Sequence, residues 1–469
     1  MKRAIVIGGG ISGLASAYYL RSKARAAGVE LEVKVLEKEE RPGGKIWSIK
    51  DQGYLCEWGP NGFLDSKPQT LELCADLGIS RQLLRSNDNA RKRYIFSNGT
   101  LHRLPENGPA FFASKLISWP GKIRLAMEPF APGNPPGVDE TLAAFGRRRL
   151  GNEALQKLIS PMVSGIFAGD PETMSLKSCF PRIAELESEY GGLVKAMVLL
   201  ARKKRRERAE GKVVSSVSGP GGILTSFREG IEELTASLTE NLGTDVVATG
   251  QQVLEVKQGQ SVPYRVRTGA GELEADLVVV AAPSFAAAGM LRSMKGQTAD
   301  ILDEIPYASM TIACFGYEKE RLGHNLDGFG YLIPKAEGMS TLGTLWDSSI
   351  FENRAPEGHV LLRSMLGGAC FPEYVELPDD EVESRVKQDL LTTMGIKEMP
   401  EFTRVYRHEK AIPQYTVGHG ARLKALDENL AALPGLLLSG NSYRGISLND
   451  CVSSAVRAAD EGLAYLKGR

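Results

Sequence analysis

The apolar and polar positions near the N-terminus follow the order strand, glycine-rich turn, helix, strand. Residues 4–7 form an unbroken, largely β-branched apolar run, which is typical of a buried parallel strand. Glycines dominate residues 8–13, and residues 14–23 are rich in alanine and lack proline, which favours a helix. Residues 31–36 alternate between apolar and charged side chains and end at Glu37. The pattern predicts a βαβ unit with parallel strands.

Further apolar runs indicate that the same sheet continues far along the chain. After a loop at 221–223 we expect a helix over 224–242, then strands near Val247, over 251–256 and over 277–282. Pro283 ends the last of these strands. A strand over 436–438 leads through a turn into a helix of small residues from about Asp450. Residues 105–211 are instead helix-rich and interrupted by proline and glycine, with one helix opening at Asp139 and carrying arginines at 147–149 near its end.

Composition narrows the classes of function. The chain has 57 Lys and Arg against 57 Asp and Glu, so it has no general attraction for nucleic acid. No stretch reaches the roughly 20 apolar residues of a membrane-spanning helix, and the N-terminus does not resemble a signal peptide, so we expect a cytoplasmic protein. The six cysteines form no Cys-x-x-Cys pair and the five histidines have no metal-ligand spacing, so no metal centre is expected.

The first glycine-rich turn matches the Gly-x-Gly-x-x-Gly fingerprint of dinucleotide-binding folds. In that fingerprint Gly8 makes the tight turn, Gly10 lets the backbone approach a pyrophosphate, and Gly13 lets the helix pack on the strand. Free N–H groups at the helix N-terminus attract the phosphates. We expect Glu37 to accept hydrogen bonds from both ribose hydroxyls and to repel a 2′-phosphate, which disfavours NADP. A glycine turn without a ligand is the alternative.

A second glycine-rich loop follows the second strand. Arg41 precedes Gly43 and Gly44, a combination that resembles the Arg-x-Gly-Gly element of the FAD family containing amine oxidases, carotenoid desaturases and protoporphyrinogen oxidases. The resemblance implies that this loop crosses the diphosphate and flavin of FAD, with Arg41 neutralising phosphate charge. A surface turn is the alternative. From the two loops we expect cofactor contacts by Gly8, Gly9, Gly10, Ile11, Ser12, Gly13, Glu37, Lys38, Arg41, Gly43, Gly44 and Lys45.

Longer segments resemble the oxygen-dependent protoporphyrinogen oxidase and coproporphyrinogen III oxidase family over nearly the whole chain. The segments that carry the resemblance are 8–14, 58–63, 165–170, 328–334 and, most specifically, 412–419, 440–443 and 448–451. The expected fold class is α/β, with a discontinuous Rossmann-like FAD-binding domain, an α+β substrate-binding domain and a helical domain that touches a membrane or forms a lid. The expected ranges are 1–92, 213–285 and 405–469 for the first, 93–104 and 286–404 for the second, and 105–212 for the third.

Residue roles are implied by the resemblance, position by position. Flavin contacts are implied for Gly59, Pro60, Asn61, Gly62, Val253, Asn441, Ile446, Ser447 and Leu448, and substrate contacts for Arg93, Gly165, Ala168, Phe329, Gly330, Leu332 and Met365. Many members of the wider family have Asp where Asn441 stands, which favours the porphyrinogen branch. No acid or base stands out. Asn61 is the candidate catalytic residue, as an orienting group near the flavin, although some relatives carry Arg at that position.

The residue types suit a porphyrinogen, which is a wide apolar macrocycle with propionate carboxylates. Leu332 and Met365 offer apolar surface, and the fork of Arg93 can pair a carboxylate bidentately. Each residue taken alone is more typical of plain core or of a solvated surface charge, so only their joint position supports the pocket. The sequence leaves protoporphyrinogen IX and coproporphyrinogen III open, since these differ by two carboxylates.

The resemblance implies FAD-dependent oxidation of a porphyrinogen to a porphyrin in haem biosynthesis. Flavin N5 would accept a hydride from each saturated bridge, and molecular oxygen would reoxidise the flavin with release of hydrogen peroxide. An amine oxidase on the same fold is the nearest alternative, but it needs an aromatic cage, and residues 439–450 offer only Tyr443 and no cysteine placed for covalent flavin. A non-catalytic flavin-binding protein is the other alternative.

The sequence also leaves the role of the helical region open. Residues 109–119 mix aromatic, apolar and basic side chains, which suits either a membrane surface or a lid packed over the active site. The basic run 202–206 is typical of a solvated helix end, with anionic lipid contact as the minor reading. Peripheral contact with the inner face of the cell membrane and a homodimer both stay open.

Overall fold

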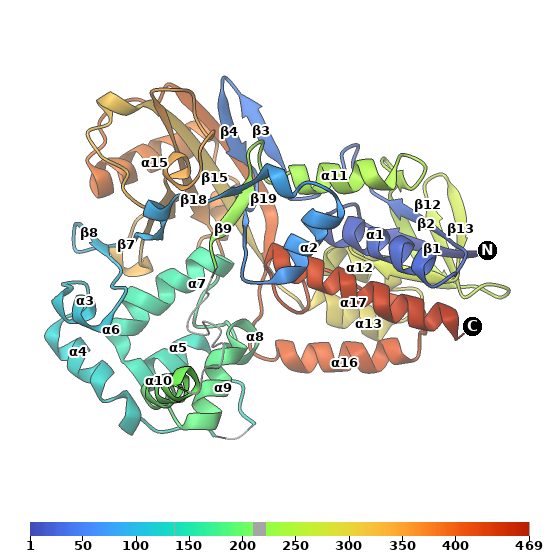
Figure 1. The fold of residues 1–469 in the computed structure, drawn as a ribbon, viewed down its shortest axis with the longest axis horizontal. Coiled ribbons are helices and arrows are strands. Elements are labelled where there is room, and N and C mark those ends of the chain that lie inside the picture. The colour runs from blue at the N-terminus through green and yellow to red at the C-terminus, as the bar shows by residue number, and fades with distance from the viewer. Residues whose placement is uncertain (136, 210–221, 469) are drawn as a thin grey trace.

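A five-stranded parallel sheet organises one end of the computed structural model, which describes residues 1–135, 137–209 and 222–468 (Figure 1). Its strands come from the N-terminal, middle and C-terminal parts of the chain, so the sheet is assembled from distant segments. In spatial order they are β10 (Val247–Ala248), β2 (Leu31–Leu36), β1 (Lys2–Ile7), β14 (Leu277–Val280) and β20 (Leu436–Leu438).

Both faces of this sheet are buried, which is why its strands are almost continuously apolar. One face packs against α1 (Ile11–Ala26), α11 (Glu233–Leu242) and α17 (Leu448–Lys467). The other packs against α12 (Ser284–Leu291), α13 (Gly296–Asp303), α16 (His419–Ala431) and the small sheet β11 (Val253–Gln258), β12 (Tyr264–Thr268) and β13 (Gly271–Ala275). The Rossmann-like α/β prediction is confirmed.

A seven-stranded mixed sheet forms the second unit. Its order is β19 (Phe402–Pro413), β15 (Tyr307–Glu318), β18 (His359–Gly367), β17 (Thr341–Leu345), β16 (Gly330–Leu332), β7 (Arg93–Ser97) and β8 (Thr100–Arg103). Helix α15 (Asp379–Met394) covers one face through an apolar core. The other face turns toward the segment 57–59 and the helical region.

Short helices gather below this sheet in Figure 1. They are α3 (Gly108–Ala113), α4 (Trp119–Ala126), α5 (Leu142–Phe145), α6 (Asn152–Ala154), α7 (Ser160–Phe167), α8 (Leu176–Cys179), α9 (Pro181–Tyr190) and α10 (Leu193–Ala209). Two small sheets connect the units: β3 (Ser48–Asp51) with β4 (Tyr54–Glu57), and β5 (Phe63–Leu64), β9 (Leu224–Phe227) and β6 (Leu83–Arg85), with α2 (Pro68–Asp76) alongside.

Three sequence predictions of helix limits are wrong. The helix expected over 224–242 is the strand β9 followed by α11, because residues 224–227 pair with β5 on one side and β6 on the other, and Gly230 turns the chain at φ +104°. The helix expected from Asp139 begins at Leu142, where Thr141 caps it. The C-terminal helix begins at Leu448 rather than about Asp450, because Ser447 is its cap.

The predicted division into three domains stays a prediction. The boundary drawn at residue 405 falls within β19, which pairs along its length with β15 of the second unit. The boundary at 212–213 and Gly221 of the predicted loop lie outside the described residues.

Candidate functional site

The first glycine-rich turn has room for a phosphate group beside a helix N-terminus. Gly8 has φ +104°, and a Cβ on Gly13 would lie 1.8 Å from the Gly8 carbonyl oxygen, so both positions require glycine. A Cβ on Gly10, in contrast, would meet nothing within 4 Å. Among the described residues no side chain caps α1, which leaves the N–H groups at its start for an anion.

Glu37 closes the far side of this turn. Its carboxylate is 7% exposed and accepts hydrogen bonds from the Gly9 N–H at 2.6 Å and the Glu39 N–H at 2.9 Å. A carboxylate has about four acceptor positions, so capacity remains for ribose hydroxyls. The Gln251 N–H bonds to the Glu37 carbonyl at 2.7 Å, which brings the start of β11, with the buried Val253, to the same end of the sheet.

The second glycine-rich loop lies directly on the first. The Gly43 N–H donates to the Gly9 carbonyl at 2.7 Å, and a Cβ on Gly44, at φ +60°, would lie 3.2 Å from the Gly10 Cα. The two loops therefore border one cradle, and the open position at Gly10 faces it. This geometry fits a diphosphate approached by backbone on two sides.

Arg41 holds the second loop in place. Its guanidinium stacks over Trp47 at 4.5 Å, pairs with Glu232 at 3.1 Å and donates to the Gly44 carbonyl at 2.8 Å. These contacts fix the loop from its outer side, and phosphate neutralisation by Arg41 stays a prediction. Lys38 is exposed and pairs with Glu39 at 2.8 Å.

Lys45 ends this loop in a half-buried position. Its ammonium donates to the carbonyls of Lys410, at 2.6 Å, and Ala411, both at the end of β19. Burial lowers the pKa of Lys45 to about 8. The side chain therefore connects the second glycine-rich loop to the second sheet.

The segment 59–62 packs against the second loop. A Cβ on Gly59 would lie 2.2 Å from the Lys45 carbonyl oxygen, and one on Gly62 would lie 2.5 Å from the Thr225 carbonyl oxygen. Pro60 is exposed between them. The Nδ2 of Asn61 is buried and has no hydrogen-bond partner within the described part of the chain. A buried amide without a partner marks a place where a polar group of a ligand fits.

The C-terminal turn completes the same border. A Cβ on Gly440 would lie 3.8 Å from the Ser12 Oγ, so this turn lies beside the start of α1. The Tyr415 hydroxyl donates to the Asn441 carbonyl at 2.6 Å. Ser447 caps α17 in a capping box with Asp450. Three further predicted residues pack here: Leu448 is buried at the start of α17, Ile446 lies against the helical region, and Ile11 is buried at the start of α1.

The predicted substrate residues of the second sheet share one face. In strand register Met365 lies opposite Gly343, Gly343 opposite Leu332, and two positions along, Gly330 lies opposite Arg93. Side chains alternate along strands, so these residues point away from α15 and toward the side on which the segment 57–62 lies. The helical region supplies the rest: a Cβ on Gly165 would lie 2.9 Å from Leu332, and the α7 helix ends at Ala168 in the left-handed conformation, φ +49°.

Arg93 presents an exposed cation at the end of this face. Its guanidinium lies 5.1 Å from the ring centre of Phe329. Among the described residues, no acid forms an ion pair with it. The neighbouring Lys92, in contrast, pairs with Asp327 at 2.5 Å.

The chain matches the family model of flavin containing amine oxidoreductases over residues 11–462. It belongs to that family. It is 32% identical to coproporphyrinogen III oxidase of Bacillus subtilis over 99% of this chain and 98% of the relative, and 32% identical to chloroplastic protoporphyrinogen oxidase of rice over 98% of this chain and 88% of the relative. A crystal structure from Exiguobacterium, provisionally assigned as a protoporphyrinogen oxidase, superposes with a TM-score of 0.83 at 27% identity and covers 99% of both chains.

The family confirms the predictions of FAD as cofactor and of an oxidoreductase. The cradle bordered by Gly10, Gly44 and the start of α1 fits the diphosphate of FAD, and Asn61 with the turn at Asn441 would border the flavin. The assignment of each single residue stays a prediction.

Sequence reasoning missed Arg363. This arginine stands in β18 on the same face as Met365 and donates to the carbonyls of Glu57 and Gly59. The signal was present, since a charged side chain interrupts the apolar run at 360–362.

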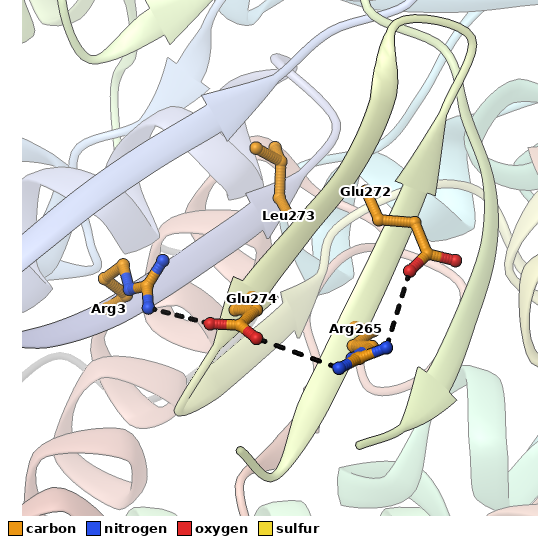
Figure 2. Close-up of a pocket in the computed structure, with 5 residues that line it drawn as sticks. All are labelled: Arg3, Arg265, Glu272, Leu273 and Glu274. Carbon is orange, nitrogen blue, oxygen red and sulfur yellow. Dashed lines mark hydrogen bonds and ion pairs between the residues drawn. The ribbon is translucent and has the colours of Figure 1, made fainter. Parts of the chain in front are cut away.

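A surface hollow elsewhere has a different character. It is lined by Leu273 and by an exposed chain of ion pairs in which Arg3 meets Glu274 at 3.1 Å and Arg265 meets Glu274 and Glu272 at 3.9 and 3.8 Å (Figure 2). Solvated pairs of this kind contribute little and offer no apolar wall for a macrocycle. Among the described helices, none is long and apolar enough to cross a bilayer.

Proposed function

We propose that the protein oxidises a porphyrinogen to the corresponding porphyrin, with FAD as cofactor and molecular oxygen as electron acceptor. The proposal rests chiefly on one face of the second sheet. There the Arg93 guanidinium, which has no acidic partner among the described residues, lies at the end of a flat apolar row beside the segment 57–62. Relatives of similar length carry the names coproporphyrinogen III oxidase and protoporphyrinogen oxidase, which supports the substrate class.

The residues of this face divide the work of binding. Arg93 would pair a propionate carboxylate at the exposed end of the face. Gly343 lies between Met365 and Leu332 in register, and its missing side chain leaves the row flat. A flat macrocycle could lie on this row with its edge toward the segment 59–62. Bound FAD supplies hydride acceptance, and the protein excludes water and fixes the reacting carbon at near-attack distance.

The direct test is turnover with both substrates. The FAD-loaded protein is mixed anaerobically and then aerobically with coproporphyrinogen III or protoporphyrinogen IX, and porphyrin fluorescence, oxygen uptake and peroxide are followed. We expect flavin bleaching without oxygen, and porphyrin with three equivalents of oxygen consumed in air. Absence of bleaching by either porphyrinogen would refute the proposal. The ratio of kcat/KM for the two substrates assigns the physiological one.

The aromatic cage of an amine oxidase finds no support at the C-terminal turn. Tyr443, the sole aromatic of residues 439–450, is 3% exposed and packs in the core beneath the parallel sheet. Simple amines in the same assay are expected to leave the flavin oxidised.

We also propose a peripheral membrane contact through the outer edge of the helical region. Trp119 and Ile123 lie four residues apart on α4, Met127 follows at the same spacing as its C-cap, and the three form an exposed apolar strip. Phe112 and Phe130, which flank α4 in the chain, are exposed as well. Phe130 is 85% exposed, which is costly for a phenylalanine in water. The cytoplasmic location stays a prediction.

Vesicle sedimentation tests this contact. We expect the protein to sediment with anionic vesicles at low salt, and Trp119→Ser with Phe130→Ser to remain in the supernatant. Met399→Ser removes an equally exposed apolar side chain from the other unit and serves as the control. A wild-type protein that stays in the supernatant at low salt would exclude the membrane role.

A further inference from the structure

Arg363 connects the substrate face to the segment that borders the flavin site. It is 3% exposed, and its Nη1 donates to the Glu57 carbonyl at 3.1 Å and the Gly59 carbonyl at 2.9 Å. Its Nε lies 2.9 Å from the carboxylate of Asp347, which is 2% exposed. The guanidinium thus bonds two backbone carbonyls two residues apart, while its charge is balanced by Asp347 at the start of α14 (Asp347–Ile350), just after β17.

The segment that it holds is closely packed against the second glycine-rich loop. Gly59 lies against the Lys45 carbonyl with no room for a side chain, and Asn61 carries the unpartnered buried amide. The Trp58 carbonyl accepts from His408 Nε2 of β19 at 2.8 Å. The position of 57–61 is therefore set by donors from the second sheet.

The backbone of Arg363 belongs to β18, which carries part of the substrate face. Arg363 stands two residues before Met365 on β18, so both side chains point to the same side. In register it lies opposite Leu345, which lies opposite Gly330, which lies opposite Arg93. Any shift of this side chain would change the separation between 59–61 and the row that carries the predicted substrate contacts.

Stability alone does not account for an ion pair at this place. A buried guanidinium is costly to desolvate, and apolar residues of similar volume are often no worse for stability. The pair instead supplies geometric specificity, because the rigid guanidinium plane fixes Nη1, which donates to both carbonyls, relative to Nε, which faces Asp347. We propose that Arg363 is a positioning residue, which fixes segment 57–61 of the flavin border relative to the substrate face. This inference rests on the proposed function for its kinetic readout but not for its flavin readouts.

The decisive variant is Arg363→Lys. It keeps the positive charge, but its single nitrogen cannot take the place of Nη1 at the two carbonyls and of Nε beside Asp347 at the same time. We expect the FAD dissociation constant to rise about 10-fold, the order expected for one charge-assisted hydrogen bond. We expect a shifted flavin absorption band and reduction potential, and a lower kcat per bound flavin with the KM for the porphyrinogen changed by less than about twofold.

A matched control separates positioning from general destabilisation. Arg149 is also a buried arginine, 1% exposed and paired with Glu187 at 2.7 Å, but it lies in the helical region. Arg149→Lys should lower stability and leave the flavin band, potential and kcat per bound flavin unchanged. The double variant Arg363→Met with Asp347→Leu removes both charges together and should show the same flavin changes as Arg363→Lys.

Several results would overturn the inference. One is a flavin absorption band and reduction potential in Arg363→Lys that equal those of the wild type. Another is a change of band and potential in Arg149→Lys as large as that in Arg363→Lys. The third is failure of both Arg363 variants to fold, which would assign the residue to folding. A wild-type protein that binds FAD without oxidising a porphyrinogen would instead refute the proposed function, and the band and potential would still decide the role of Arg363.

Discussion

Removal of the Arg93 charge is the sharpest test of the substrate face. The guanidinium lies over Phe329 and, among the described residues, has no acidic partner, so Arg93→Met breaks no ion pair of the protein itself. Methionine keeps an unbranched apolar stem that can pack on the same ring. The variant should therefore fold normally and bind FAD as the wild type does.

The magnitude follows from the exposure of the site. A hydrogen bond to a charged group contributes about 1.5–3 kcal/mol, and solvent screening places an exposed arginine at the low end. About 1.4 kcal/mol corresponds to a 10-fold change in equilibrium constant, so the KM for the porphyrinogen should rise about 10-fold. The carboxylate is remote from the oxidised bridge, so the contact is equal in ground and transition states and kcat should hold.

The assay is porphyrin fluorescence at several substrate concentrations, with flavin content measured in parallel. Arg103→Met is the control, because Arg103 pairs in register with Tyr94 and thus faces the opposite side of the sheet. We expect its KM to be unchanged. An unchanged KM in Arg93→Met, or a fall in kcat with no change in KM, would refute the placement of the carboxylate at Arg93.

Two further predictions concern the cofactor border and pH. Gly59→Ala should yield protein with little bound FAD, measured by absorbance, because the new Cβ would lie 2.2 Å from the Lys45 carbonyl oxygen. The control Gly289→Ala, where nothing lies within 4 Å of the new Cβ, should retain FAD. Equal flavin content in the two variants would contradict this prediction. Burial lowers the pKa of His419, whose ring bonds to the Tyr443 carbonyl. As pH falls through about 6.5, the unfolded chain therefore takes up a proton at this residue before the folded protein does. The free energy of unfolding should then fall by at most about 1.4 kcal/mol per pH unit. Denaturant titrations at about pH 7.5 and 5.5 should show a smaller loss in His419→Gln, and an equal loss would exclude His419 as its source.

Local patterns predicted the parallel sheet and the glycine loops because their physics is local. The turn at Gly8 and the helix start after Gly10 depend on neighbouring residues, and the strand at 31–36 reveals itself by its own alternation. The failure at 224–242 has the opposite cause. Residues 224–227 are a strand only because β5 and β6 lie on either side, and those partners come from more than a hundred residues earlier.

The sequence could not predict which side chains contact one another, for the same reason. Arg41 looks like a phosphate ligand in the sequence, but its nearest acid, Glu232, arrives from a distant helix start. The role of Arg363 depends on two backbone carbonyls that lie some three hundred residues earlier in the chain. Both arginines hold loops that the sequence did predict, so the sequence located the border of the site but not what fixes it.

The segment 109–119 shows why its sequence could not distinguish a membrane surface from a lid over the active site. Leu116 and Ile117 are buried in a cluster with Ile95 and the predicted substrate residue Leu332, as a lid over the sheet requires. Trp119, which follows two positions later, is 66% exposed and begins the apolar strip of α4. A mixed composition at 109–119 therefore serves two surfaces, one turned toward the substrate face and one toward solvent. A lid over the sheet and the proposed membrane contact would therefore use different surfaces of this segment, so the two predictions are compatible.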